Sequence, residues 1–440
     1  MIVRDLKRLA LLAGPFLLLF LLSVSLWQSQ NDDLRSRVGA LFDNHGLPTN
    51  PSASTSPRAP RLTPDKTHYQ VFSQSTPDGE FFDIRFDEDA LNPNIIPHPK
   101  FNNTWYIVAQ LPPKHERGSL EINVEEVGCV AQFIKGALMC IDPAQPLPYE
   151  PTPGGNCQGD IDFFNLNIGP RDARVFFGPQ NIWTVFASNS AFTCFGQFIQ
   201  DFRALVDWYP KWMAKASDAD FSVGTEIERP FPHAPMEKDY FIFWDKDDAM
   251  HVHYDMFPQR GYAKLKPDGK TGPELASETA ERDAKCLRHY LPELVDNGFE
   301  SIRQATNSLR VTLCERVDST CEPRDDNTYI MTVVHHKTDL AFRSEYEPYV
   351  VLFQQRAPYE LYAVSRRPLW ISGRTPRGDG LPTDAVSITS ANWRDRGRNY
   401  HGFLDDVIML GFQYGERHSA GIDVRAGDLL VDLGLCKDAS

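Results

Sequence analysis

Short runs of β-branched and aromatic residues recur along most of this chain, each bounded by Pro, Gly, Asn or Asp. Runs of this length and composition are typical of β-strands. They lie at residues 104–109, 175–177, 182–187, 239–244, 329–334, 349–353 and 407–412. The clusters repeat at intervals of roughly 50 to 90 residues, and a repeated strand unit indicates the blades of a β-propeller. A β-sandwich, or an α/β sheet with irregular helices, is the alternative.

One segment has a different periodicity. Apolar residues recur at helical spacing, at Leu275, Ala276, Ala280, Ala284, Leu287, Leu291 and Leu294. Pro292 is expected to kink or divide this helix, because proline cannot donate a helical hydrogen bond. The pattern predicts a helical insertion at about residues 272–310 within a mainly β domain.

The N-terminus contains an uncharged apolar run at residues 9–27. Nineteen helical residues span roughly 28 Å, close to the thickness of a bilayer core. Basic residues precede the run and acidic ones follow it, which predicts a signal anchor with residues 1–8 in the cytosol. A cleaved signal peptide is the alternative. Residues 28–66 include a segment rich in Pro, Ser and Thr, at 48–60, and are expected to form a disordered stalk.

Charge and length limit the remaining classes. The chain has 440 residues and a formal net charge of -14, so a dominant nucleic-acid binder is excluded. Removing the anchor and stalk leaves residues 67–440, a size that suits one propeller. This order of segments predicts a type II membrane protein of the Golgi or ER with a lumenal C-terminal domain. The motifs of serine hydrolases, zincins, NTPases and dinucleotide oxidoreductases are absent from the sequence.

Cysteine usage agrees with a lumenal domain. Eight cysteines follow the stalk, and an even number suggests disulfides in an oxidising compartment. Cys129 and Cys140 could join a hairpin, and Cys314 and Cys321 a short loop. No Cys-x-x-Cys pair exists, which argues against a zinc site. Asn102 begins the clear N-glycosylation sequon, Asn102-Asn103-Thr104.

The segment 169–178 carries the sharpest chemical signal. Asp172 lies between Arg171 and Arg174 at the start of an expected strand. Neighbouring arginines stabilise the charged form of a carboxylate, which suits acid/base chemistry or the binding of sugar hydroxyls. A structural Asp–Arg pair at a turn is the alternative.

Four stretches resemble one known superfamily. Residues 171–175 resemble a Glu-Asp-Pro-Arg-Ile/Val motif. Residues 91–99 resemble an Asn-Pro turn that precedes the first strand. Residues 236–258 resemble a Glu-Lys-Asn-Trp strand that is followed by a Tyr-x-x-x-Pro strand. Residues 403–415 are similar to a closing Tyr-Gly strand. These are features of the five-bladed propeller superfamily of β-mannoside phosphorylases and related mannosyltransferases, and the order of segments resembles a fungal-type Golgi glycosyltransferase.

The resemblance implies roles for individual residues. Asp172 falls on the catalytic acid, Arg174 on the arginine beside it, and Asn92 and Lys238 on positions that face the centre of the propeller. The sequence departs from the motif at Arg171, Ala173 and Asp239-Tyr240. The phosphate-binding set of the phosphorylases is not matched, so the resemblance favours sugar transfer over phosphorolysis.

The predicted function is therefore a glycosyltransferase that moves a hexose, mannose in the first instance, from a nucleotide-sugar donor to a glycan acceptor. Asp172 is the candidate base for the acceptor hydroxyl. The candidate diphosphate contacts are Arg171, Arg174, Lys238 and Arg229. His335 and His336 are candidates for sugar or phosphate contacts, with a satisfied structural histidine as the alternative.

Acidic pairs supply further candidates. Asp160 and Asp162 form an Asp-x-Asp triplet that could hold Mg²⁺ or Mn²⁺ against a diphosphate. Asp405 and Asp406 are candidates for acceptor-sugar binding. A glycoside hydrolase or phosphorylase on the same scaffold is the first alternative and needs a second carboxylate opposite Asp172. A non-catalytic lumenal sugar-binding protein is the second.

Overall fold

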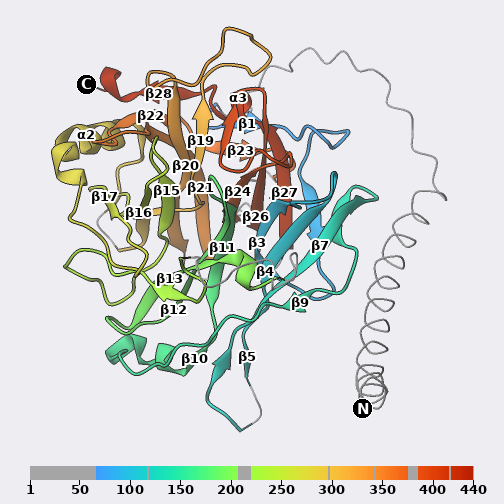
Figure 1. Ribbon diagram of the computed structural model, residues 1–440, viewed down its shortest axis with the longest axis vertical. Helices are drawn as coiled ribbons and strands as arrows, with labels where there is room; N and C mark the ends of the chain where they lie inside the picture. The colour runs from blue at the N-terminus through green and yellow to red at the C-terminus, as the bar shows by residue number, and fades with distance from the viewer. Residues whose placement is uncertain are drawn as a thin grey trace, which may run out of the picture. The chain divides into compact units, whose positions relative to one another are not determined.

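The computed structural model describes residues 66–115, 118–206, 220–295, 298–340, 343–374, 385–415 and 418–439 (Figure 1). These residues belong to one compact unit, residues 59–440. The expected anchor at 9–27 and the stalk up to residue 65 lie outside the described residues. Among the described helices, none has the length and apolar character needed to cross a membrane.

Most of the described strands form five antiparallel groups in chain order, and the first and fifth groups are joined in one nine-stranded sheet. The first is β3 (Leu91–Pro97), β4 (Trp105–Gln110), β7 (Glu126–Ile134) and β8 (Ala137–Cys140). The second is β11 (Arg171–Phe177), β12 (Ile182–Asn189), β13 (Phe195–Asp201) and β14 (Thr225–Glu226). The third is β15 (Phe241–Trp244), β16 (Met250–Asp255) and β17 (Gly261–Lys264). A mainly β, propeller-like arrangement is confirmed.

The fourth and fifth groups contain the longest strands. The fourth is β18 (Glu300–Gln304) and β19 (Leu309–Thr312), both paired with β20 (Thr328–Leu340), then β21 (Arg343–Gln354), β22 (Leu361–Ser365) and β28 (Leu433–Leu435). The fifth is β24 (Val386–Trp393), β26 (Val407–Tyr414) and β27 (His418–Arg425). Smaller strands are β1 (Tyr69–Val71), β5 (Lys114–His115), β6 (Ile122–Asn123), β9 (Gln145–Pro146), β10 (Asn167–Ile168), β23 (Leu369–Ile371) and β25 (His401–Phe403).

Strand β2 (Phe82–Arg85) closes the ring of groups. Phe82 and Asp83 pair antiparallel with β27 of the fifth group. Ile84 and Arg85 pair parallel with β8 of the first group. Figure 1 shows the blue N-terminal strands lying among the red C-terminal ones. The seam between the first and fifth groups is therefore bridged by a strand of only four residues.

The first strands of the groups, β3, β11, β15, β18/β19 and β24, face one another and are joined by side-chain amides. Asn94 on β3 donates to the Ala173 carbonyl and accepts from the Val175 amide of β11. Asn392 on β24 donates to the Val175 carbonyl, and Asn307, between β18 and β19, donates to the Ala391 carbonyl of β24. These buried amides satisfy backbone groups that no neighbouring strand reaches, as buried polar groups require.

The apolar side chains of the strands fill the space between the groups. The largest cluster packs the second, third and fourth groups around buried residues that include Phe176, Trp244, Tyr262 and Phe353. A second cluster packs the fourth group against the fifth, around Leu309, Val350 and Phe412. Burial of both faces explains why these strands read as continuous apolar runs.

The predicted helical insertion is shorter than expected. The helix α2 covers Ala280–Tyr290, and short helical turns lie at Ala276–Glu278 and, elsewhere, at α3 (Ala426–Leu429). Residues 300–304 and 309–312 are strands, so the prediction of helix up to about residue 310 is wrong. Their pairing with β20 supplies a full ladder of hydrogen bonds, which outweighs a weak local preference.

All eight cysteines are paired. Cys129–Cys140 joins β7 to β8 and Cys314–Cys321 closes a loop of the fourth group, which confirms the two pairs considered from the sequence. The others are Cys157–Cys194 and Cys286–Cys436, the second of which ties α2 to the C-terminal end. Those two connect segments 37 and 150 residues apart, so spacing in the sequence did not reveal them.

Candidate active site

Three residues with left-handed backbone conformation lie at the beginning of the first strands of neighbouring groups. They are Asn92 with φ 55°, Asp172 with φ 55° and Asp239 with φ 62°. Asn92 and Asp172 occupy β-bulges, where the register of β3 against β4 and of β11 against β12 shifts by one residue. A bulge re-aims a side chain, and such strained positions cluster at functional sites. The bulges therefore indicate that the candidate functional site lies at this end of the strands.

Asp172 is held from both its side chain and its backbone. The Asn92 side-chain amide donates to Asp172 Oδ1 over 2.6 Å, and the Asp172 backbone N–H donates to Gln110 Oε1 over 2.9 Å. The next backbone N–H, of Ala173, donates to Glu126 Oε1 over 3.1 Å. These three bonds fix the bulge and therefore the direction of the carboxylate.

The Asp172 side chain is exposed to solvent, but protein atoms pack closely around its carboxylate and reduce its hydration. Loss of hydration raises the pKa of Asp172 above its usual value. Arg174 and Arg171 oppose this rise, while Asp239 adds to it. A raised pKa makes the carboxyl group hold a proton more readily, which suits a residue that takes up and releases a proton during a reaction.

Basic side chains surround this carboxylate. Arg174 donates to the Thr389 carbonyl of β24, and Arg303 on β18 forms an ion pair of 3.5 Å with Asp239. Burial lowers the pKa of Lys238, and Arg303 lowers it further. We name as the Asp172 cluster the residues Asn92, Arg171, Asp172, Arg174, Lys238, Asp239, Arg303, Lys337 and Asp339. It has five basic and three acidic members, in a chain that is acidic overall.

Glu126 lies behind the bulge and was not identified from the sequence. It is 1% exposed, and burial raises the pKa of its carboxyl well above the usual value. Its Oε2 has no hydrogen-bond partner among the described residues. A carboxylate in such a place would be costly, so burial favours the neutral form of the Glu126 carboxyl. Glu126 lies on a strand whose sequence is mainly apolar, and no sequence motif identified it as a site residue.

A buried chain of hydrogen bonds reaches the same end of the strands from α2. Asp283 accepts from Arg260 over 2.9 Å, with both side chains 1% exposed. Arg260 Nε donates to His253 Nε2 over 3.1 Å, and His253 Nδ1 donates to Gln304 Oε1 over 2.6 Å. Gln304 Nε2 donates to the Asp239 carbonyl over 2.6 Å. Gln304 therefore fixes the backbone of a residue in the Asp172 cluster.

The histidines predicted as ligand contacts have structural partners. His335 is buried, and its Nε2 accepts from the Ile388 backbone N–H over 3.2 Å. Burial, assisted by Arg174, lowers the pKa of His335 to about 3, so the ring is neutral and is not a cation for phosphate. His336 lies 3.4 Å from Glu300 on the adjacent strand. The structural alternative holds for both.

Arg229 also has structural partners. Its Nε donates to Glu237 Oε1 over 2.9 Å, and its Nη1 donates to Asp255 Oδ2 over 2.9 Å. The guanidinium lies over the Tyr254 ring. Two carboxylates already occupy this side chain, so it orders the segment before Lys238 instead of offering free donors to a diphosphate.

The predicted acceptor site at Asp405 and Asp406 lies at the opposite end of the strands. Asp405 accepts from the Arg316 and Val317 backbone N–H groups, and Asp406 accepts from the Arg316 side chain. They follow the C-terminal end of β24. Beyond that end, Asn399 donates to the carbonyl of Pro179, which lies just beyond the C-terminal end of β11. The length of β11, roughly 20 Å, separates them from Asp172. Both residues bond the Cys314–Cys321 loop, and their role in binding an acceptor sugar stays a prediction.

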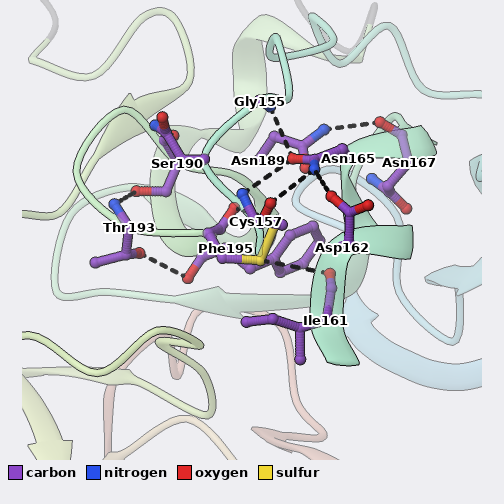
Figure 2. The surroundings of a disulfide bond; sticks show 12 residues. Gly155, Cys157, Ile161, Asp162, Asn165, Asn167, Asn189, Ser190, Thr193 and Phe195 are labelled. Carbon is purple, nitrogen blue, oxygen red and sulfur yellow. Dashed lines mark hydrogen bonds between the residues drawn. A yellow bond between two sulfur atoms is a disulfide. The ribbon is translucent and has the colours of Figure 1, made fainter. Parts of the chain in front are cut away.

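The expected metal pair lies in a short helical turn, Gly159–Leu166. Figure 2 shows Asp162 accepting from Asn165, which also bonds the backbone at Gly155 and Cys157 beside the Cys157–Cys194 disulfide. Within the described residues no group of three His, Cys, Asp or Glu side chains could hold a metal ion. Asp160 and Asp162 have no third ligand of this kind beside them in the described part of the chain, and Asp162 is already bonded to Asn165.

Of the predicted site residues, the structure brings Asn92, Arg171, Asp172, Arg174 and Lys238 together. It adds Arg303 and Lys337, which sequence reasoning missed because residue 303 was assigned to a helix and Lys337 follows a strand without a motif. It is the pairing of β18 with β20 that brings these residues to the site, and this pairing places Arg303 opposite His335. Asn102 lies exposed in the turn before β4.

No protein-family profile matches the sequence, and no curated protein sequence matches it. Solved structures do. The chain is similar to a glycosyl hydrolase from Bacteroides ovatus, with 10% identity, a TM-score of 0.42, and coverage of 83% of this chain and 96% of that one. It is similar to MPT-1, a GDP-Man-dependent mannosyltransferase from Leishmania mexicana (10%, 0.37, 80% and 92%). It is also similar to the α-L-arabinanase of Cellvibrio cellulosa (11%, 0.39, 77% and 91%).

Proposed function

We propose that this protein is a five-bladed β-propeller glycosyltransferase that moves a hexose from a nucleotide-sugar donor to a hydroxyl of a glycan acceptor. The observation that carries the proposal is the Asp172 cluster, in which Arg171, Arg174 and Lys238 act on one carboxyl group of raised pKa. Arg303 and Lys337 form ion pairs with Asp239 and Asp339 of the same cluster. The sequence resemblance around Asp172 supports mannose as the hexose.

The chemistry assigns one role to each kind of side chain. Asp172 accepts the proton of the acceptor hydroxyl while the acceptor oxygen forms a bond to C1 of the sugar. The bond from C1 to the phosphate oxygen breaks, and the nucleoside diphosphate leaves with the electron pair. In this proposal Arg174, Lys238 and Arg303 stabilise the negative charge that develops on the leaving diphosphate, which their positive charges around Asp172 and Asp239 support.

The presence of Asp239 near Asp172 favours a second candidate function, the hydrolysis of a glycoside. Its charge acts on Asp172, and a glycoside hydrolase requires two carboxyl groups about 5 to 9.5 Å apart. Arg303 pairs with Asp239, however, and the excess of basic residues suits an anionic leaving group better than a neutral glycoside. Sugar transfer therefore explains more of the cluster than hydrolysis does.

The proposed location is the lumen of the Golgi or ER, with residues 9–27 as a type II anchor. Four disulfides within the described unit support an oxidising compartment. The partners in this proposal are the membrane, a nucleotide-sugar donor and a glycan acceptor.

The test uses the purified full chain and a panel of nucleotide sugars that includes GDP-mannose. Donor binding is measured by thermal shift, and transfer is measured with wild type, Asp172→Asn and the exposed control Asp160→Asn. Asparagine tolerates a positive φ, so Asp172→Asn is expected to fold. Transfer should fall by about 10²- to 10⁴-fold in that variant alone.

The other outcomes assign the other functions. Cleavage of a neutral glycoside without any nucleotide would identify a hydrolase, and its loss in both Asp172→Asn and Asp239→Asn would identify the two carboxyl groups. Sugar binding that survives Asp172→Asn, with no turnover by wild type, would identify a sugar-binding protein.

A further inference from the structure

A cavity of about 580 Å³ lies at the seam between the first and fifth strand groups. It lies at the end of the strands opposite to Asp172, where β3 ends and β4 begins. Its walls come from both sides of the seam, with Phe101, Asn102, Trp105 and Phe133 on one side and Arg394 and Asp423 on the other. Its volume is in the range of small-molecule sites, about 300–1,000 Å³.

The walls combine aromatic faces with fixed polar groups. Phe101 is 51% exposed, and the Trp105 and Phe133 rings pack edge to face with centroids 5.2 Å apart. Trp105 Nε1 is buried without a hydrogen-bond partner among the described residues. Arg394 is held by Asp395 and Asp423. Apolar ring faces bordered by charged hydrogen-bonding groups match a pyranose, which has apolar C–H faces and polar edges.

The sequon asparagine is part of the wall. Asn102 is exposed in a turn in which the Thr104 hydroxyl donates to the Asn102 carbonyl over 3.1 Å. The same turn is ordered by His98, whose Nδ1 accepts from the Lys100 and Phe101 backbone N–H groups. A sugar attached to Asn102 would therefore begin inside the cavity from a turn that is already formed.

We propose that Asn102 carries an N-linked glycan whose first N-acetylglucosamine occupies the seam cavity and packs against Phe101. The covalent bond joins Asn102 Nδ2 to C1 of the sugar, displaces the diphosphate of a lipid-linked donor, and releases one amide proton. The bound sugar contacts both strand groups and stabilises a seam that β2 bridges with four residues. The Asp172 cluster stays open because it lies at the other end of the strands.

The proposal depends on the lumenal location but not on the reaction, so its test needs no activity assay. The full chain is produced in a eukaryotic secretory host as wild type, Asn102→Gln, Asn103→Gly and Phe101→Ala. Asn103→Gly is the matched control, since it preserves the sequon and its φ of 51° suits glycine. Intact mass should show a glycan in all forms except Asn102→Gln.

Docking of the sugar is tested by thermal unfolding before and after enzymatic removal of the glycan. Removal should lower the Tm of wild type and Asn103→Gly by roughly 1–3 °C, and that of Phe101→Ala by clearly less. An unmodified wild-type chain would overturn the proposal. A glycan whose removal leaves the wild-type Tm unchanged, or lowers it equally in Phe101→Ala, would overturn the docking in the cavity.

Discussion

The carboxylate of Asp172 accepts a 2.6 Å hydrogen bond from the side-chain amide of Asn92, 80 residues earlier in the chain. Both residues have a φ of 55°, and both lie on bulges of strands that face each other. Two equivalent distortions in neighbouring groups thus create one contact. Since a hydrogen bond donated to a carboxylate favours its charged form, Asn92 works against the burial that raises the Asp172 pKa.

Removing this amide should therefore change the pH dependence of transfer. Asn92→Gly keeps the positive φ and deletes the donor. The ionised form of Asp172 loses support, so its pKa rises and the acidic limb of the pH–rate profile moves to higher pH, with transfer reduced along that limb. Asn103→Gly, at a positive φ far from the site, is the control and should leave the profile in place. A limb that stays in place, or moves to lower pH, would contradict the role of Asn92.

Glu126 should tolerate glutamine but not leucine. Glutamine keeps an oxygen that accepts from the Ala173 N–H, and it is neutral, which is the form of Glu126 that burial favours. Leucine leaves that N–H without a partner, which costs about 1–3 kcal/mol and loosens the bulge that carries Asp172. Urea unfolding and kcat should show Glu126→Gln close to wild type and Glu126→Leu lower in both. Equal damage from the two substitutions would mean that the acid itself takes part in the reaction.

Gln304 should act as a positioning residue. Gln304→Met has similar volume but gives up the bonds to the Asp239 carbonyl and to His253. Two buried polar groups lose partners, so the free energy of unfolding should fall by about 2–3 kcal/mol. Misplacement of Asp239 should lower kcat at saturating donor more than it raises KM. His336→Gln, at a half-buried position of β20, is the control. An unchanged kcat in Gln304→Met would show that Gln304 serves stability alone.

Buried neutral histidine should make the fold sensitive to acid. The pKa of His335 is about 3 in the folded chain, mainly through burial, and near 6.5 when unfolded. The unfolded chain therefore binds a proton that the folded chain does not, and stability falls as pH drops from 6.5 toward 3. His335 contributes a slope of about 1.4 kcal/mol per pH unit in that window. Unfolding measured at several pH values should show a slope smaller by this amount in His335→Gln; an unchanged slope would place the titration elsewhere.

The strand runs were read correctly from local composition, because alternation and β-branching reflect how each strand packs. Residues 104–109 and 407–412 match β4 and β26 closely. The helix at 280–290 was also visible, since its apolar residues recur at helical spacing. The boundary at 300–312 was missed because those strands depend on β20, whose pairing is not a local property.

The sequence by itself determined Asp172 as the candidate catalytic residue, because two arginines beside an acid can be read without a fold. It also determined the turns, the cysteine number and the sequon. Only the tertiary structure decided which charges meet. It placed Arg303 beside Asp239, buried Glu126 behind the bulge, and moved Asp405 and Asp406 to the other end of the strands. Electrostatic interactions depend on distance and burial, and both are set by strand register across groups that lie far apart in the chain.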